Sequence, residues 1–166
     1  MFRLKEEIER DGWKTYMAIR KEKVEERGRH KIKDVQIIPQ LLFVKCTKKW
    51  LDSFKSGAYK DYFMVYRQRV VSGSGQSSLE AAPIPEAQMN LFIFVTSAGD
   101  GTDISYYGGE MQSFVKGEKV RVTEGPYKGA IGVVKRIKRD RKLLVAVEGV
   151  TVVAISKIPA AFLEKI

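Results

Sequence analysis

The last third of the chain consists of short β-rich runs separated by glycine, proline and other turn residues. The four runs are Lys119–Thr123, Ile131–Ile137, Leu143–Val147 and Val150–Ile155. The turn signals between them are Gly125-Pro126, Gly129, Gly132, Arg139-Asp140 and Gly149. Runs of this length fit strands rather than helices, and glycine lets the backbone turn tightly between them. We therefore predict a small antiparallel all-β barrel over residues 115–166.

The part before these runs has longer mixed segments. They predict an α+β domain over residues 1–107, an antiparallel sheet with flanking helices, followed by a linker at 108–114. Helices are expected from Phe2 to near Asp11-Gly12 and at Lys48–Lys55, where Thr47 can cap the first turn. Strands are expected at Trp13–Arg20, Val35–Cys46, Tyr62–Arg69 and Asp103–Tyr107.

For three further segments of this part, the sequence pattern does not decide the secondary structure by itself. Lys21–Lys33 is highly charged and fits a mobile loop or a protruding hairpin. Ser72–Ser78 has the composition of a flexible connector, so we expect a flexible insert at about 69–82. The segment from Pro85 to Val95 starts as a helix can, but its apolar end also suits a strand.

Positive charge is concentrated in the C-terminal part of a chain that carries +10 at pH 7. Residues 116–166 hold twelve Lys and Arg against five Asp and Glu, whereas residues 1–115 hold eighteen against fifteen. A compact basic unit favours a nucleic-acid partner, although positive charge also keeps a small protein in solution. Six basic residues, which we expect to bind backbone phosphates, cluster here: Lys135, Arg136, Lys138, Arg139, Arg141 and Lys142.

The sequence offers few groups for catalysis or for metal binding. The one histidine, His30, lies among basic residues, and the one cysteine, Cys46, alternates with apolar residues as a packed strand residue does. Zinc-site spacing of cysteine and histidine is absent from the sequence. We expect no enzyme, no metal and no cofactor. Apolar runs stay far below the roughly 20 residues of a membrane helix, so we expect a cytoplasmic protein without a membrane partner.

Residues 115–132, VKGEKVRVTEGPYKGAIG, closely resemble the KOW motif. This motif is a β-barrel element that NusG-type factors share with several ribosomal proteins. The resemblance implies a small SH3-like KOW domain over residues 115–166, in agreement with the turn pattern.

Two upstream segments resemble the N-terminal (NGN) domain of NusG-like factors. Ile37–Cys46, IIPQLLFVKC, is similar to its central strand, and Ile84–Met89, IPEAQM, to the start of its last long helix. The second likeness favours a helix through Val95. The details are closest to UpxY-type antiterminators. The resemblance implies a non-catalytic transcription elongation or antitermination factor whose first domain binds the clamp helices of RNA polymerase.

The resemblance also implies site residues and partners. The apolar patch for polymerase would contain Ile38, Leu41, Phe43 and Tyr66, although each of these residues also fits an ordinary core position. Nascent RNA or DNA, a ribosomal protein or another KOW partner are the further partners it allows. The chief alternative function is a ribosome-associated or RNA-binding KOW protein, and a third is a paralogue that has lost activity. The family's first strand has no counterpart before Phe2, and an open sheet edge there predicts dimerisation.

Overall fold

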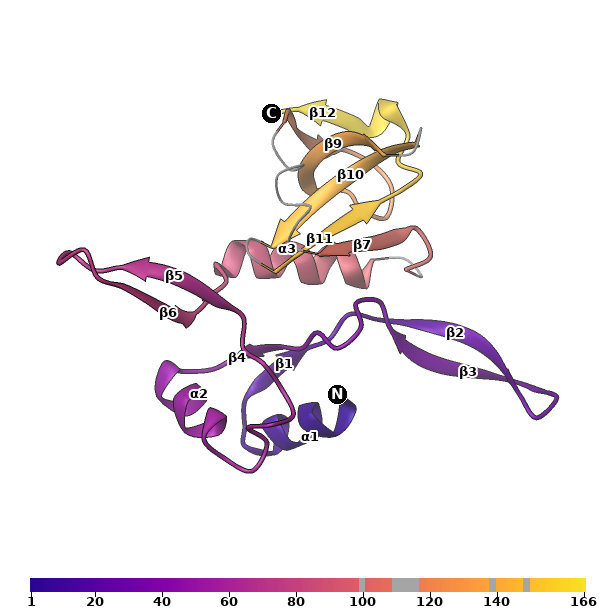
Figure 1. Cartoon of the computed structure of the whole chain (residues 1–166). Helices are drawn as coiled ribbons and strands as arrows, with labels where there is room; N and C mark the ends of the chain where they lie inside the picture. Colours follow the sequence, from indigo (N-terminus) through magenta and orange to yellow (C-terminus); the bar gives the residue numbers. More distant parts are fainter. Residues whose placement is uncertain (99–100, 109–116, 138–139, 148–149) are drawn as a thin grey trace. The chain divides into compact units, whose positions relative to one another are not determined.

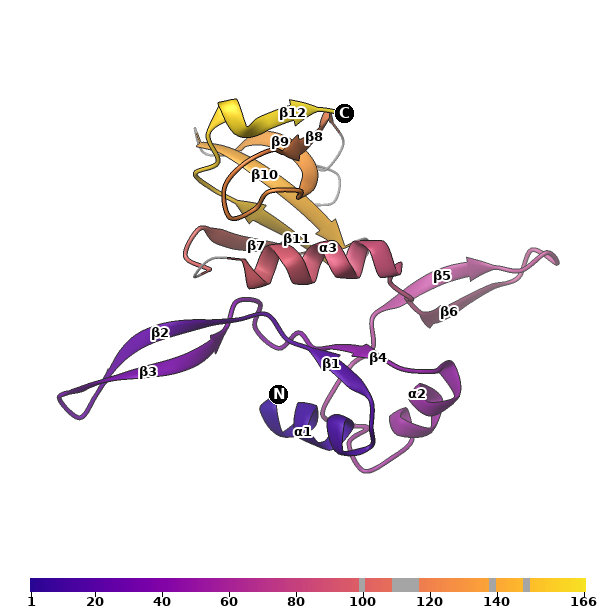
Figure 2. The same ribbon diagram turned by 180° about the vertical axis from the view of Figure 1, so that it is seen from behind.

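The computed structural model describes residues 1–98, 101–108, 117–137, 140–147 and 150–166. Figures 1 and 2 show it from opposite sides. Within these ranges the fold is α+β, and every strand pair is antiparallel. The helices are α1 (Phe2–Arg10), α2 (Lys48–Lys55) and α3 (Glu86–Ser97), with a 3-10 turn at Ala160–Phe162. The strands are β1 (Lys14–Tyr16), β2 (Ile19–Glu26), β3 (Arg29–Gln36), β4 (Phe43–Lys45), β5 (Arg67–Val71), β6 (Ser77–Ala81), β7 (Ile104–Gly108), β8 (Lys119–Val122), β9 (Ile131–Ile137), β10 (Asp140–Val147), β11 (Thr151–Ile155) and β12 (Leu163–Lys165).

The chain divides into two compact units. The first comprises Met1–Met17 and Gln40–Pro83, and the second comprises Ala18–Pro39 and Ile84–Ile166. This grouping differs from the predicted domains, because α3 and β7 belong with the C-terminal strands. The predicted linker itself lies outside the described residues apart from Gly108, so a boundary at 108–114 stays a prediction.

Aromatic side chains around α2 hold the first unit together. Trp50 stacks on Phe54 with ring centroids 4.6 Å apart, and the ring of Trp13 lies 5.3 Å from that of Trp50. Phe63 packs on Phe54 at 5.4 Å. The predicted cap is confirmed, because Thr47 Oγ1 accepts a hydrogen bond from the Trp50 amide at 3.3 Å. The cap fixes the residue at which α2 begins. Within the helix, Trp50 and Phe54 are four residues apart and therefore lie on the same face.

The prediction of one strand over Val35–Cys46 is wrong. The chain leaves β3 after Gln36, and only Phe43–Lys45 pairs again, as β4 against β1. Pro39 between them lacks an N–H, and Gln40 takes a φ of +60°, which extended backbone excludes. The strand expected over Trp13–Arg20 is likewise divided, between β1 and β2.

The prediction of a strand over Tyr62–Arg69 is wrong in its first half. Tyr62 and Met64 are 79% and 95% exposed, and β5 begins only at Arg67. Alternating β-formers make a strand only where a neighbour supplies hydrogen bonds, and no described strand pairs with residues 62–66. β5 pairs with β6 instead, so the expected insert at 69–82 contains a hairpin.

The second unit contains the β2–β3 hairpin and a six-stranded sheet. The hairpin confirms one of the two alternatives for Lys21–Lys33, and Arg27 and Gly28 turn it with positive φ. The sheet has the order β12-β8-β9-β10-β11-β7, and the four strands predicted from the C-terminal runs are confirmed within it.

Helix α3 confirms the helix predicted through Val95 and completes the C-terminal sheet. Three consecutive residues of β10, Leu143, Leu144 and Val145, are 0–2% exposed, so both faces of this strand are covered. α3 packs against β10, as Figure 1 shows, and its own Phe92 and Val95 are fully buried. None of the helices in the described ranges has the length and apolar character needed to cross a membrane.

Candidate nucleic-acid interface

Strands β9 and β10 continue beyond their outer neighbours in the sheet. β8 pairs with β9 only as far as Val133, and β11 pairs with β10 only from Leu143. Beyond these points the register continues between the two strands alone, through Lys135↔Lys142, Arg136↔Arg141 and Ile137↔Asp140. These six residues, here called the basic ribbon, therefore form a two-stranded segment whose outer edges carry no third described strand.

The basic ribbon places like charges directly opposite each other. Lys135 faces Lys142, and Arg136 faces Arg141. Cβ atoms at such positions are about 5 Å apart, and like charges there are destabilising. Within the described part of the chain, no carboxylate forms an ion pair with any of the four. A polyanion that lies against the ribbon would relieve this repulsion.

The two pairs occupy opposite faces of the ribbon, because successive strand residues point to opposite sides. Arg136 and Arg141 are exposed. Lys135 and Lys142 are partly buried, and Lys142 Nζ donates to Ser105 Oγ on β7 at 3.4 Å. The ribbon thus carries positive charge on both faces. The other two predicted residues of this set, Lys138 and Arg139, lie outside the described residues.

The β2–β3 hairpin (residues 19–36) is also rich in charge, with seven basic and four acidic residues, and there part of the positive charge is paired. Across its strands Lys21 faces Asp34, Glu22 faces Lys33 and Glu26 faces Arg29. Lys33 and Lys31 each lie 3.3 Å from a carboxylate oxygen of Glu26, and their hydrogen bonds hold the pKa of Glu26 below its ordinary value. Because Arg20, Lys31 and Lys33 already form ion pairs with carboxylates, this hairpin is a weaker candidate for phosphate binding than the basic ribbon.

We expect Arg141→Glu to stabilise the fold by about 0.5–1 kcal/mol, because it replaces a like-charge pair with Arg136 by an attractive one. Urea unfolding of the full chain measures the change. The matched control is Arg121→Glu on β8, where Glu164 already faces the arginine, so the same substitution creates repulsion and should destabilise. A loss of stability in both variants would contradict the register of the ribbon.

The four predicted polymerase-binding residues differ in accessibility. Ile38 and Phe43 are each only 8% exposed, whereas Leu41 is partly buried and Tyr66 is 51% exposed. Ile38 lies in the second unit and the other three lie in the first. Leu41 and Tyr66 are therefore the members that a partner can reach without local unfolding.

Residues missed by the sequence analysis have recognisable signals. Tyr62 and Met64 alternate with Tyr66 and are more exposed than it is, and this alternation is the signal that predicts a strand over Tyr62–Arg69. The facing of like charges in the ribbon has no such signal. Counting outward from the turn predicted at Arg139-Asp140 would place Lys135 opposite Leu144, whereas the structure pairs Lys135 with Lys142.

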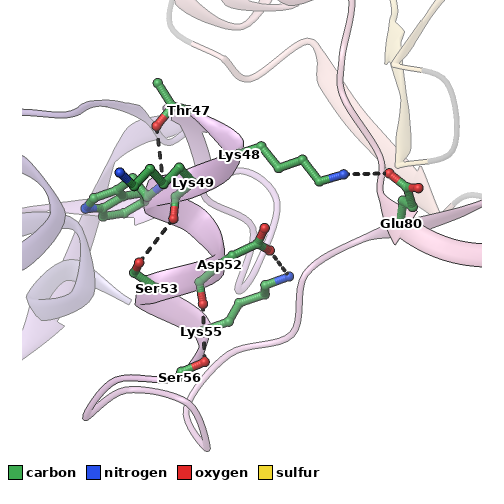
Figure 3. Close-up of polar contacts among 9 residues, drawn as sticks. Thr47, Lys48, Lys49, Asp52, Ser53, Lys55, Ser56 and Glu80 are labelled. Carbon is green, nitrogen blue, oxygen red and sulfur yellow. Dashed lines mark hydrogen bonds and ion pairs between the residues drawn. The ribbon is translucent and has the colours of Figure 1, made fainter.

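A second charged region lies on α2 and β6, but its charges are paired. Lys48 Nζ lies 2.9 Å from Glu80 Oε2, and Lys55 Nζ lies 2.7 Å from Asp52 Oδ1 (Figure 3). These hydrogen bonds raise the pKa of Lys48 and lower that of Asp52. The same four side chains help line an open cavity of about 220 Å³. Arg67 lines the cavity as well. Since two of these three cations already have a carboxylate, the cavity is a weak candidate for an anion site.

Comparison with protein families finds a KOW motif at residues 116–153, a range that spans β8 to β11 and contains the basic ribbon. Comparisons with curated proteins and with solved structures give no match. The chain therefore contains a KOW motif, which indicates an RNA-binding or ribosome-associated role.

Proposed function

We propose that this chain is a non-catalytic transcription elongation or antitermination factor of the NusG-like type. Its first unit would bind the clamp helices of RNA polymerase, and its KOW-containing part would bind nucleic acid. The observation that carries the proposal is the order of elements ahead of the KOW motif. After Pro39 come β4, α2, β5, β6 and α3. Because β6 lies within the insert expected at 69–82, the remaining order is the strand–helix–strand–helix order that the resemblance to an NGN domain implies.

Polymerase binding of this kind needs an exposed apolar surface that receives a helical coiled coil. Among the residues proposed for it, Leu41 and Tyr66 reach solvent in the first unit. Phe43, on β4 opposite Tyr16 of β1, is buried and would support the surface rather than form it. The proposed contact therefore rests first on Leu41.

The test is copurification of RNA polymerase with the full chain. We expect Leu41→Asp to abolish binding while the circular dichroism spectrum stays unchanged, since a partly exposed residue can carry a charge without unfolding the chain. Phe43→Asp should instead unfold the first unit, because an unpaired buried charge costs several kcal/mol. Leu79→Asp, at a 63% exposed position of the same unit, should leave binding intact. Full polymerase binding by Leu41→Asp would remove this residue from the contact.

The alternative is a ribosome-associated or RNA-binding KOW protein, and the uncompensated charge of the basic ribbon favours it. Under this alternative the chain would bind ribosomal RNA with an affinity that falls steeply with salt. Non-specific contacts of this kind have dissociation constants of about 10⁻⁴–10⁻⁶ M near physiological salt. Tight, salt-sensitive binding to ribosomal RNA without polymerase copurification would favour this alternative over the elongation factor.

A further inference from the structure

We propose that the basic ribbon binds duplex DNA by entering its major groove. The inference rests on the proposed nucleic-acid role of the KOW-containing part and specifies the ligand. Its basis is the placement of Lys135 and Lys142 on one face of a two-stranded segment that extends past its flanking strands, and of Arg136 and Arg141 on the other.

The dimensions of the ribbon match this groove. A β-sheet with its side chains is about 10 Å thick, and the major groove of B-form DNA is about 12 Å wide. From Val134, whose partner Leu143 is the last residue of β10 paired with β11, to Ile137 the ribbon advances three residues, roughly 10 Å. The groove is about 8.5 Å deep, so the ribbon is long enough to reach its floor.

The charge distribution matches the groove as well. Phosphates line both walls of a groove, so a segment inside it needs cations on both faces. A flat phosphate surface would instead engage one face and leave the other pair of like charges uncompensated. Asp140, the one acid of the ribbon, faces Ile137 at its outer end. Its single negative charge is outnumbered by the four described cations. The net charge of the ribbon therefore still favours a polyanion.

Two other nucleic acids fit the ribbon less well. The major groove of A-form RNA is deep and too narrow for side chains to read. Proteins that bind single strands stack bases on aromatic rings, and no residue from Val134 to Ile137 or from Asp140 to Leu143 is aromatic. Duplex DNA is the ligand that uses both charged faces and requires no stacking surface.

The experiment measures binding of the full chain to duplex DNA of mixed sequence, to duplex RNA of the same sequence and to single-stranded DNA, by fluorescence anisotropy over a range of salt. We expect duplex DNA to bind about tenfold more tightly than duplex RNA. Methyl green, which occupies the major groove, should compete with the protein, whereas the minor-groove ligand netropsin should not.

Paired variants test whether both faces bind. Each double variant, Lys135→Ser with Lys142→Ser and Arg136→Ser with Arg141→Ser, should reduce the salt slope by about two units, because each phosphate contact contributes about 0.9. The control is Lys31→Ser with Lys33→Ser in the β2–β3 hairpin, where Glu26 pairs with both lysines, and it should leave the slope unchanged. Unfolding curves of all variants confirm that the fold is retained.

Three results would overturn the inference: equal or tighter binding to duplex RNA, a preference for single-stranded DNA, or a slope that depends on one face only. Polymerase copurification with the same proteins separates this outcome from failure of the proposed function. If DNA binding fails while polymerase binding persists, only the inference is wrong. If polymerase binding fails while DNA binding persists, the elongation factor is wrong and the ribbon remains a DNA-binding element.

Discussion

Replacing Gly132 with alanine is expected to separate β9 from β10 and to unfold the C-terminal sheet. A Cβ atom at this position would lie 2.4 Å from the carbonyl oxygen of Leu144 and 3.0 Å from Leu143 Cδ1. The closer contact is with backbone, which no change of rotamer can relieve. Overpacking of a core usually costs about 1–3 kcal/mol, and a clash with the backbone of the paired strand should cost at least the upper value.

Thermal unfolding of the full chain followed by near-ultraviolet circular dichroism measures the effect of Gly132→Ala. Gly73→Ala is the matched control, because a Cβ there meets no atom within 4 Å and its φ is not positive. We expect the control to unfold as the natural sequence does. If Gly132→Ala unfolds at the same temperature as the natural sequence, β9 and β10 lie further apart at this point than the structure has them.

The sequence predicts the C-terminal strands well because the residues that end each strand are its neighbours along the chain. Turn residues, mostly glycine and proline, follow each run, and strands of this length need no long-range information to be located. The helix over Lys48–Lys55 is predicted for the same reason, since Thr47 supplies the cap from the adjacent position. Both predictions depend only on residues that are neighbours along the chain.

The errors arise where a strand depends on a partner that is distant in sequence. Tyr62–Tyr66 has the alternation of a strand but no partner among the described strands, so it stays irregular. β7 was predicted as a strand, yet its pairing with β11 places it in the C-terminal sheet rather than in the first domain. Composition identifies the basic cluster of the candidate site. That its like charges lie opposite each other follows from the register between β9 and β10, which only the structure specifies.

The pairing of β7 and the packing of α3 lead to the second large expected effect, that of Phe92→Ala. Phe92 is fully buried on a helix that packs against β10. Removing a buried phenylalanine side chain typically costs about 3–5 kcal/mol. We expect that loss to appear within the C-terminal sheet as well as in the helix, because α3 covers one face of β10.

Hydrogen exchange of the full chain, read at the amides of Leu144 and Val152, locates the effect of Phe92→Ala. If α3 and the sheet form one cooperative unit, protection at both amides falls together with protection in the helix. Phe94→Ala is the control on the same helix, since its side chain is 41% exposed and its removal should change little. If the sheet keeps full protection while α3 loses its own, the C-terminal strands fold independently, as the predicted boundary at 108–114 requires. The same pair of variants therefore decides whether α3 stabilises the sheet that carries the basic ribbon or only lies against it.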